Sequence, residues 1–283
     1  MSHPRAALPP HAGPAAHLEW FGWTDIGRVR KNNEDAFLGL RFDAQEVHLL
    51  GKHGEASLAS HDMTFAVCDG MGGAKAGEYA SQIAVSKIMT LLPRAFFQSA
   101  VRGLDPDFPD VLEELYTQVH QSLVYLGWAY EECHGMQTTM SLCWFTPGWM
   151  YFGHVGDTRI YHLAAETGAF RQLTEDDTHV GWLYRNGKIT DYEARTHPRR
   201  NVLQKALGGE NHYVDPQVGA VNCSGGGVFL LCSDGLSEGL YEHHMLDVLR
   251  VNKPGFNPAK ALVESAVKGD GRDNTTAIVV RVV

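Results

Sequence analysis

Residues 64–73 read TFAVCDGMGG, and later parts of the chain repeat the pattern of this stretch. Its first half, residues 64–68, is a short apolar run with β-branched and aromatic residues, which is typical of a buried strand. The run ends on Asp69, and three glycines follow within four residues. Glycine allows sharp turns and a close approach of the main chain to a ligand. The stretch therefore suits a hard cation, although Asp-Gly is also a common turn pair.

The pattern of an apolar run followed by an acid recurs twice. Residues 151–157 read YFGHVGD, and residues 228–235 read VFLLCSDG. Near the C-terminus, GRDN at 271–274 immediately precedes another strand-like run, and RKNNED at 30–35 collects cations and acids upstream. The acids at these strand ends and turns are Glu34, Asp69, Asp157, Asp234 and Asp273.

These acids predict a centre that binds divalent cations. The chain has neither a zinc-type histidine pair nor a cysteine cluster, and oxygen ligands favour Mg²⁺ or Mn²⁺. Converging carboxylates repel each other unless cations neutralise them. Two neighbouring divalent ions would do so, and would activate a bridging water for attack on a phosphate ester. Arg30, just before the acidic pair Glu34 and Asp35, is the best local candidate for binding the phosphate oxygens.

Strand-like and helix-like runs follow one another in groups rather than in regular alternation. Helical spacing is expected over 76–97, 111–126, 241–251 and 258–267, and strands over 138–173, 210–231 and 275–283. Residues 43–62 are expected to form a polar excursion between strands. The grouping favours an α+β fold, a layered sandwich of two antiparallel β-sheets flanked by pairs of α-helices. We expect a disordered tail over 1–17 and one domain over 18–283.

Composition limits the kinds of binding partner and the cell compartment that we expect. The formal net charge is −9, which disfavours nucleic acids and anionic membranes, and no apolar run approaches the length of a membrane span. The five cysteines stand at 68, 133, 143, 223 and 232 without a close pair, which predicts free buried thiols in a reducing cytoplasm. The N-terminus lacks the pattern of a secretory signal. A single domain predicts a monomer.

Five short motifs, in order, carry a resemblance to a known family. They are RKNNED at 30–35, DGMGG at 69–73, GDTR at 156–159, SDGL at 233–236 and GRDN at 271–274. Together they resemble the successive motifs of the metal-dependent protein phosphatases of type 2C, in their bacterial form. The resemblance extends from about residue 18 to 283. It implies the same layered fold and hydrolysis of phosphoserine and phosphothreonine by a metal-activated water. The implied partners are phosphorylated proteins, namely a serine/threonine kinase or its substrates.

The resemblance also implies ligands for two metal ions. Asp69 would bridge the two ions, and the carbonyl oxygen of Gly70 would bind the first. Asp234 and Asp273 would bind the second ion, with Glu34 near it, directly or through water.

Three further roles follow from the resemblance. Arg30 would bind the phosphate, and Asp35 would hold metal-bound water. Asp157 resembles a ligand of a third, weaker metal ion. Glu238 stands where the family often has an aspartate, which puts the occupancy of that third site in question.

Other departures from the family concern the general acid and the segment beside the site. Met71 stands where eukaryotic members carry a histidine proposed as general acid, so that acid is unassigned. Asp176-Asp177-Thr178 replaces the family's Asp-His-Ser. Residues 180–207 correspond to the family's mobile flap, where Arg199 and Arg200 are either peptide-binding groups or solvated charges.

Motifs that other functions would require are missing from the sequence. No cysteine is followed six residues later by arginine, and neither a P-loop nor a calcium loop of the EF-hand type occurs. The serious alternative is a catalytically silent relative that acts as a regulatory binding module. Such a relative is expected to have lost metal-binding acids, whereas Asp69, Asp234 and Asp273 are all present.

Overall fold

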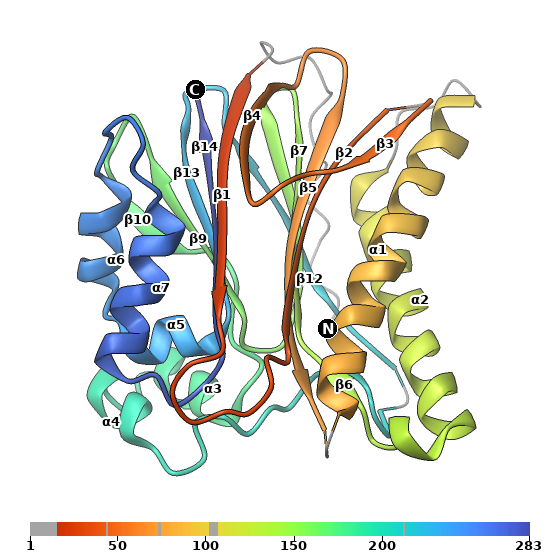
Figure 1. Ribbon diagram of the computed structural model, residues 1–283, viewed down its shortest axis with the longest axis vertical. Helices are drawn as coiled ribbons and strands as arrows, with labels where there is room; N and C mark the ends of the chain where they lie inside the picture. Colours follow the sequence, from red (N-terminus) through yellow and green to blue (C-terminus); the bar gives the residue numbers. More distant parts are fainter. Residues whose placement is uncertain (1–15, 44, 73–74, 102–106, 212) are drawn as a thin grey trace.

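Two antiparallel sheets lie face to face, with helices on the outer side of each, in the computed structural model (Figure 1). The structure describes residues 16–43, 45–72, 75–101, 107–211 and 213–283. This arrangement confirms the α+β layered sandwich predicted from the sequence. Most of the predicted tail lies outside the described residues, while its last residue, His17, already belongs to the first strand.

The first sheet has six strands in the order β10-β9-β13-β14-β1-β4. All its neighbouring strands are antiparallel. Its strands are β1 (His17–Asp25), β4 (His53–Ser57), β9 (Arg159–Ala164), β10 (Phe170–Gln172), β13 (Gly227–Cys232) and β14 (Thr275–Val282).

The second sheet has eight strands, and β5 is its longest. The order is β11-β6-β5-β7-β8-β12, with β2 also paired to β5 and β3 paired to β2. Its strands are β2 (Asp35–Phe42), β3 (Val47–Leu49), β5 (Asp62–Met71), β6 (Gln137–Thr138), β7 (Met140–Thr146), β8 (Trp149–Val155), β11 (Leu207–Gly208) and β12 (Gln217–Asn222).

Helices cover the outer face of each sheet (Figure 1). Helices α1 (Ala76–Val101) and α2 (Phe108–Ala129) pack on the eight-stranded sheet, and α5 (Asp234–Gly239), α6 (Glu242–Leu249) and α7 (Pro258–Gly269) cover the six-stranded sheet. The short helices α3 (His179–Arg185) and α4 (Asp191–Thr196) belong to a segment at one end of the sandwich, and a 3-10 turn (Glu131–Cys133) follows α2. No helix in the described part of the chain has the length and apolar character needed to span a membrane.

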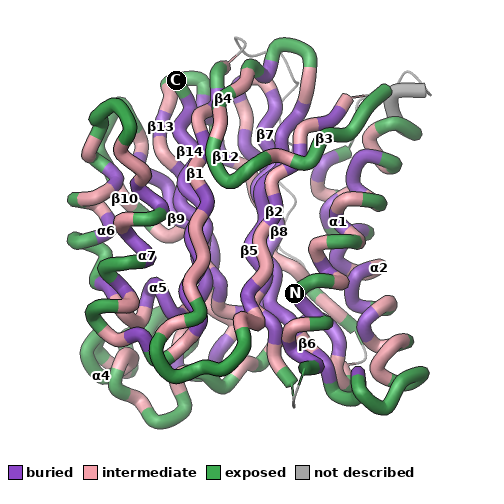
Figure 2. Tube along the Cα trace, viewed as in Figure 1, coloured by how far each residue is buried: buried purple, intermediate pink, exposed green. Residues whose placement is uncertain are grey.

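The alternation of side chains along β5 explains why the core has two layers. Met63, Phe65 and Val67 point between the two sheets, whereas Ala66 and Cys68 point toward α1 and α2. Because both faces of the strand are covered, a continuous apolar run is required there. Figure 2 shows the buried segments along the strands of both sheets and the exposed segments on the outer helices and turns. All five cysteines are buried and free, as predicted.

Several elements differ from the sequence-based expectation. The polar stretch 43–62 contains β3 and β4, which pair at the sheet edges with β2 and β1. Strand β5 continues two residues past Asp69, because Gly70 and Met71 pair with β6. Helix α1 runs to Val101, beyond the expected end at residue 97, and passes through Pro93, where burial of Leu92 and packing of Phe96 against the core favour continuation of the helix.

Candidate metal centre

Five connections that carry the predicted acids meet at the lower end of the two sheets in Figure 1. They are the β1–β2 loop, the end of β5, the β8–β9 turn, the start of α5 and the turn before β14. Strand pairing places some of these groups directly. Asp35 and Asp69 are opposite each other on β2 and β5, and the end of β1 pairs with the start of β14 next to Asp273. The sequence motifs therefore converge because of antiparallel register.

Asp69 lies at the centre of the acidic group. Its main chain is fixed by β6 and β7: its N–H donates to Thr139 Oγ1 at 3.0 Å, and its carbonyl accepts from Thr138 Oγ1 at 2.9 Å. Burial raises the pKa of Asp69 well above its ordinary value, and the neighbouring carboxylates Asp35, Asp234, Asp157 and Asp273 raise it further. A carboxylate surrounded by four others requires protons or cations to balance its charge.

Gly70 and Gly77 face each other, and neither has a side chain to separate the two main-chain segments from the Glu34 carboxylate. A Cβ at Gly77 would lie 2.8 Å from the Gly70 carbonyl oxygen and 2.9 Å from Glu34 Oε1. A Cβ at Gly70 would overlap the Gly77 carbonyl oxygen. The missing side chains thus let one carbonyl and one carboxylate oxygen approach the same point, which is the arrangement that a hard cation needs.

Asn274 fixes the loop that presents Glu34 and Arg30. Its Oδ1 accepts from the Glu34 N–H at 2.8 Å. Its Nδ2 donates to the carbonyls of Ile26 and Asn32 at 2.9 and 3.0 Å. One side chain from the turn before β14 therefore holds both ends of the β1–β2 loop.

Asp35 is buried and only partly satisfied by hydrogen bonds. Its Oδ2 accepts from Ser233 Oγ at 2.7 Å, while its Oδ1 has no partner in the protein. Burial raises the pKa of Asp35 to about 6, although its hydrogen bonds oppose the shift. An unpartnered buried carboxylate oxygen calls for a water or an ion at this position.

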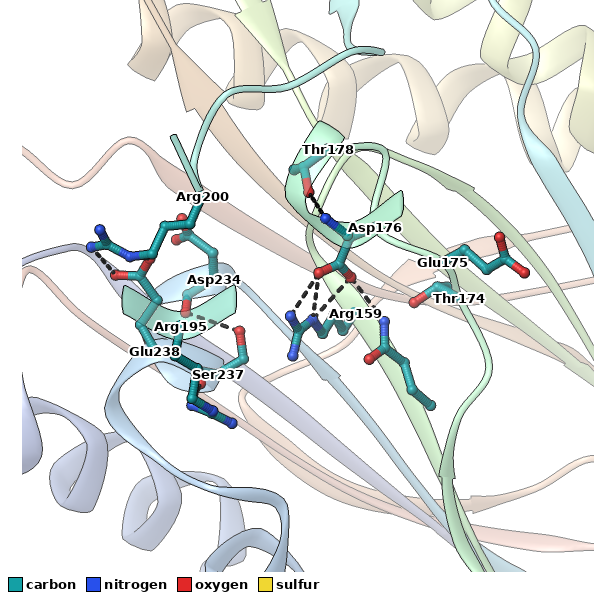
Figure 3. A network of polar contacts seen from close by, with 12 residues as sticks. Arg159, Thr174, Glu175, Asp176, Thr178, Arg195, Arg200, Asp234, Ser237 and Glu238 are labelled. Atoms are coloured by element: carbon teal, nitrogen blue, oxygen red, sulfur yellow. Dashed lines mark hydrogen bonds and ion pairs between the residues drawn. The ribbon is translucent and has the colours of Figure 1, made fainter. Parts of the chain in front are cut away.

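Asp234 and Asp157 face the same region from the start of α5 and the β8–β9 turn. The Oδ1 atom of Asp234 is also buried without a partner, and burial, followed by the charge of Asp157, raises the pKa of Asp234 well above its ordinary value. Burial, reinforced by Asp176 and opposed by Arg159, raises the pKa of Asp157 to about 7. Asp176 itself binds the Arg159 guanidinium at 2.6–3.2 Å (Figure 3).

Arg30 and Asp273 are bonded to each other. Arg30 Nη2 donates to Asp273 Oδ2 at 2.5 Å, and this bond is the main cause of the raised pKa of Arg30. Glu34 and Asp69 also raise the pKa of Arg30, so the guanidinium lies beside the acids as the sequence predicts.

The segment 179–203 is fastened to α5 next to the acids. Arg200 binds Glu238 through two hydrogen bonds of 2.8 and 3.2 Å, and Arg195 donates to the Ser237 carbonyl at 2.7 Å (Figure 3). A cavity of about 1160 Å³, lined in part by Asp157 and Asp234, lies between the segment and α5. Arg200 is thus already occupied by Glu238, whereas Arg199 is exposed.

The chemistry of the donor set fits a divalent cation. The set consists of oxygen atoms only, and two of its buried carboxylate oxygens have no protein partner. Among the described residues, however, no three of these acids bring their ligand atoms within 4.8 Å of one another. The group that does so, Asp43, Glu46 and His61, lies at the other end of β2.

Sequence reasoning missed the residues that hold the acids in place. Thr139, Ser233 and Asn274 bond to Asp69, Asp35 and the Glu34 loop, respectively. Ser233 and Asn274 each adjoin a predicted acid, so their position in the motifs was an available signal. Thr139 had no comparable signal, because its role depends on the pairing of distant strands.

Comparison with known proteins finds relatives of the same family and fold. The family model described as protein phosphatase 2C matches residues 52–261. The chain is 33% identical over 272 residues to serine/threonine protein phosphatase PstP of Mycobacterium tuberculosis, covering 94% of this chain but 45% of that protein. It therefore spans less than half the length of that relative.

One further relative and a solved catalytic domain match over nearly their whole length. The serine/threonine phosphatase Stp of Listeria welshimeri is 31% identical over 257 residues, covering 91% of this chain and 93% of that protein. The structure of the PstP catalytic domain in complex with two manganese ions superposes with a TM-score of 0.74 at 29% identity, covering 95% and 99% of the two chains. With the family model matching most of the chain, this protein belongs to the protein phosphatase 2C family.

Proposed function

We propose that this protein is a metal-dependent serine/threonine protein phosphatase that hydrolyses phosphoserine and phosphothreonine in proteins. The observation that carries the proposal is the convergence of four carboxylates on the buried Asp69, whose pKa is raised first by burial and then by Asp35, Asp234, Asp157 and Asp273. Such a concentration of buried negative charge is costly for a purely structural site. Relatives that are named serine/threonine phosphatases support the same activity.

The acids divide into ligands and supporting groups. Two Mn²⁺ or Mg²⁺ ions, when bound, supply positive charge and lower the pKa of a water molecule. Asp69 would bridge the ions, with the Gly70 carbonyl on one side and Asp234 and Asp273 on the other. Glu34 would complete the set from the β1–β2 loop. The PstP complex with two manganese ions supports the kind and number of ions, but not the choice of ligands.

Arg30 and Asp35 act on the substrate and on water. Arg30 donates one N–H, from Nη2, to Asp273. A guanidinium has five N–H donors, so other N–H groups of Arg30 would bind the phosphate oxygens. Asp35 accepts a hydrogen bond from water at its unpartnered Oδ1 and so orients it. The phosphate is released without a covalent phosphoenzyme.

A third metal ion would be held by Asp157, near Glu238, although Arg200 already binds Glu238. The substrates are phosphorylated proteins, including a serine/threonine kinase or its targets. A cytoplasmic location agrees with five buried free thiols. The monomer is proposed because the chain forms a single domain.

The test compares three substrates with the purified protein in Mn²⁺. Hydrolysis of a phosphothreonine peptide and p-nitrophenyl phosphate, with a phosphotyrosine peptide at least about tenfold slower, is the expected result. Metal binding without hydrolysis of any of the three would favour the alternative, a catalytically silent regulatory module.

A further inference from the structure

Asp177 binds both polar groups of Gly156, the residue before Asp157. The Asp177 N–H donates to the Gly156 carbonyl at 2.7 Å. In return, the Gly156 N–H donates to Asp177 Oδ2 at 3.0 Å. His154 Nε2 lies 3.0 Å from the same Gly156 carbonyl. The β8–β9 turn is therefore held by His154 from β8 and by Asp177.

The turn needs such support because its backbone is unusual. Gly156 has a φ of +110°, which side chains other than glycine rarely adopt. A Cβ at this position would lie 2.5 Å from Thr139 Cγ2. Thr139 in turn accepts from the Asp69 N–H. A displacement of the turn would thus disturb both Asp157 and the end of β5.

Asp177 is also the point where the two ends of segment 179–203 come together. Thr178, the next residue, caps α3 by accepting from the Gly181 N–H and forms a β-bridge with Leu203. The Asp177 carbonyl accepts from the Gln204 N–H at 2.7 Å. Segment 179–203 therefore begins and ends next to Asp177, the residue that is bonded to Gly156.

The charge of Asp177 adds a link to the returning chain. The side chain is 10% exposed, and its Oδ1 lies 3.9 Å from Lys205 Nζ. Lys205 also binds Asp215 Oδ2 at 3.1 Å on the surface. An amide at position 177 could accept from Gly156 but would lose the attraction to Lys205.

We propose that Asp177 is a positioning residue that makes the Gly156–Asp157 turn and segment 179–203 open and close as one unit. Opening of the segment at Asp177 would free Gly156, and release of the turn would free the base of the segment. The consequence for turnover rests on the proposed function, since the segment lines the cavity beside Asp157. The coupling itself does not depend on the proposed function.

Hydrogen exchange of the metal-free protein measures the coupling without any activity. In Asp177→Ala we expect exchange to rise about tenfold in peptides covering both 154–158 and 179–203, because a hydrogen bond to a charged group is lost. Peptides from β14 should not change. Asp177→Asn keeps the acceptor for Gly156 and should restore most of the protection. Asp215→Asn, which removes only the surface partner of Lys205, is the matched control and should resemble the wild type.

Several results would overturn the proposal. Unchanged exchange in Asp177→Ala, or a rise in only one of the two peptides, would show that the turn and the segment are independent. A loss of protection in β14 would mean general unfolding. In that case the comparison is repeated with Asp177→Ser, whose hydroxyl is too short to reach Gly156. Unchanged exchange, or a rise in only one of the two peptides, would again overturn the proposal.

Kinetics add a test of the consequence for the reaction. Asp177→Ala should raise KM for a phosphothreonine peptide several-fold more than KM for p-nitrophenyl phosphate, and Asp177→Asn should recover the difference. Equal effects on both substrates would remove the link to the segment. An inactive wild-type protein would contradict the proposed function and leave the exchange result standing.

Discussion

Asp69 is a buried carboxylate whose pKa is raised by burial and by four other carboxylates. A neutral side chain of the same shape at this position relieves the repulsion but removes the anion that two cations would share. Stability without metal and turnover with metal should therefore change in opposite directions.

Asp69→Asn should lower kcat by at least about two orders of magnitude in saturating Mn²⁺, since it removes a bridging charge. Its melting temperature without metal should equal or exceed that of the wild type. Steady-state kinetics and thermal unfolding check the two halves. Retained turnover would contradict the bridging role.

Arg30→Ala should mainly raise KM, by about tenfold to a hundredfold, because it removes a charge-assisted bond to phosphate and leaves the nucleophile in place. Arg28→Ala, an exposed arginine in the same loop, is the control and should stay near wild type. A loss confined to kcat would argue against phosphate binding by Arg30.

Helix α1 and strand β5 approach each other closely at one point only because two glycines face each other there. Gly77→Ala should cost about 1–3 kcal/mol in stability, since its Cβ would press on the Gly70 carbonyl and on Glu34. It should also weaken Mn²⁺ binding, measured by calorimetry. Gly51→Ala, with nothing closer than 3.8 Å to its Cβ, is the control and should change neither quantity.

Strand β5 begins with a second buried acid, which lies away from the centre. Asp62 accepts from Trp144 Nε1 at 2.8 Å, and burial raises the pKa of Asp62 to about 7. The folded protein thus holds this proton more tightly than the unfolded chain does, so stability falls as pH rises from about 4 to about 7.

Asp62→Asn removes that titration and can keep the bond to Trp144. Its melting temperature should exceed that of the wild type by a few degrees at pH 8 and differ little at pH 4. Asp247→Asn, an exposed control, should follow the wild-type pH profile. A constant difference at all pH values would show that Asp62 does not titrate in this range.

For the whole chain, the sequence predicted the fold class and the convergence of acids from several strand ends. Asp69, Asp157 and Asp234 were predictable because each follows an apolar run, and Asp273 because it directly precedes one. Helix α5 and the edge strands β3 and β4 were not predictable from the sequence, because they are short and depend on neighbouring elements for burial and pairing. Asn274 and Asp177 are bonded to residues far away in sequence, and only the register of the sheets reveals those partners.

The central claim is that two metal ions at Asp69 carry out phosphate hydrolysis. The most direct measurement counts bound Mn²⁺ per chain while following turnover of a phosphothreonine peptide, as Mn²⁺ is returned to protein stripped with EDTA. We predict no turnover in EDTA and full turnover only when two ions are bound. Turnover in EDTA, or full activity with one ion per chain, would contradict the account.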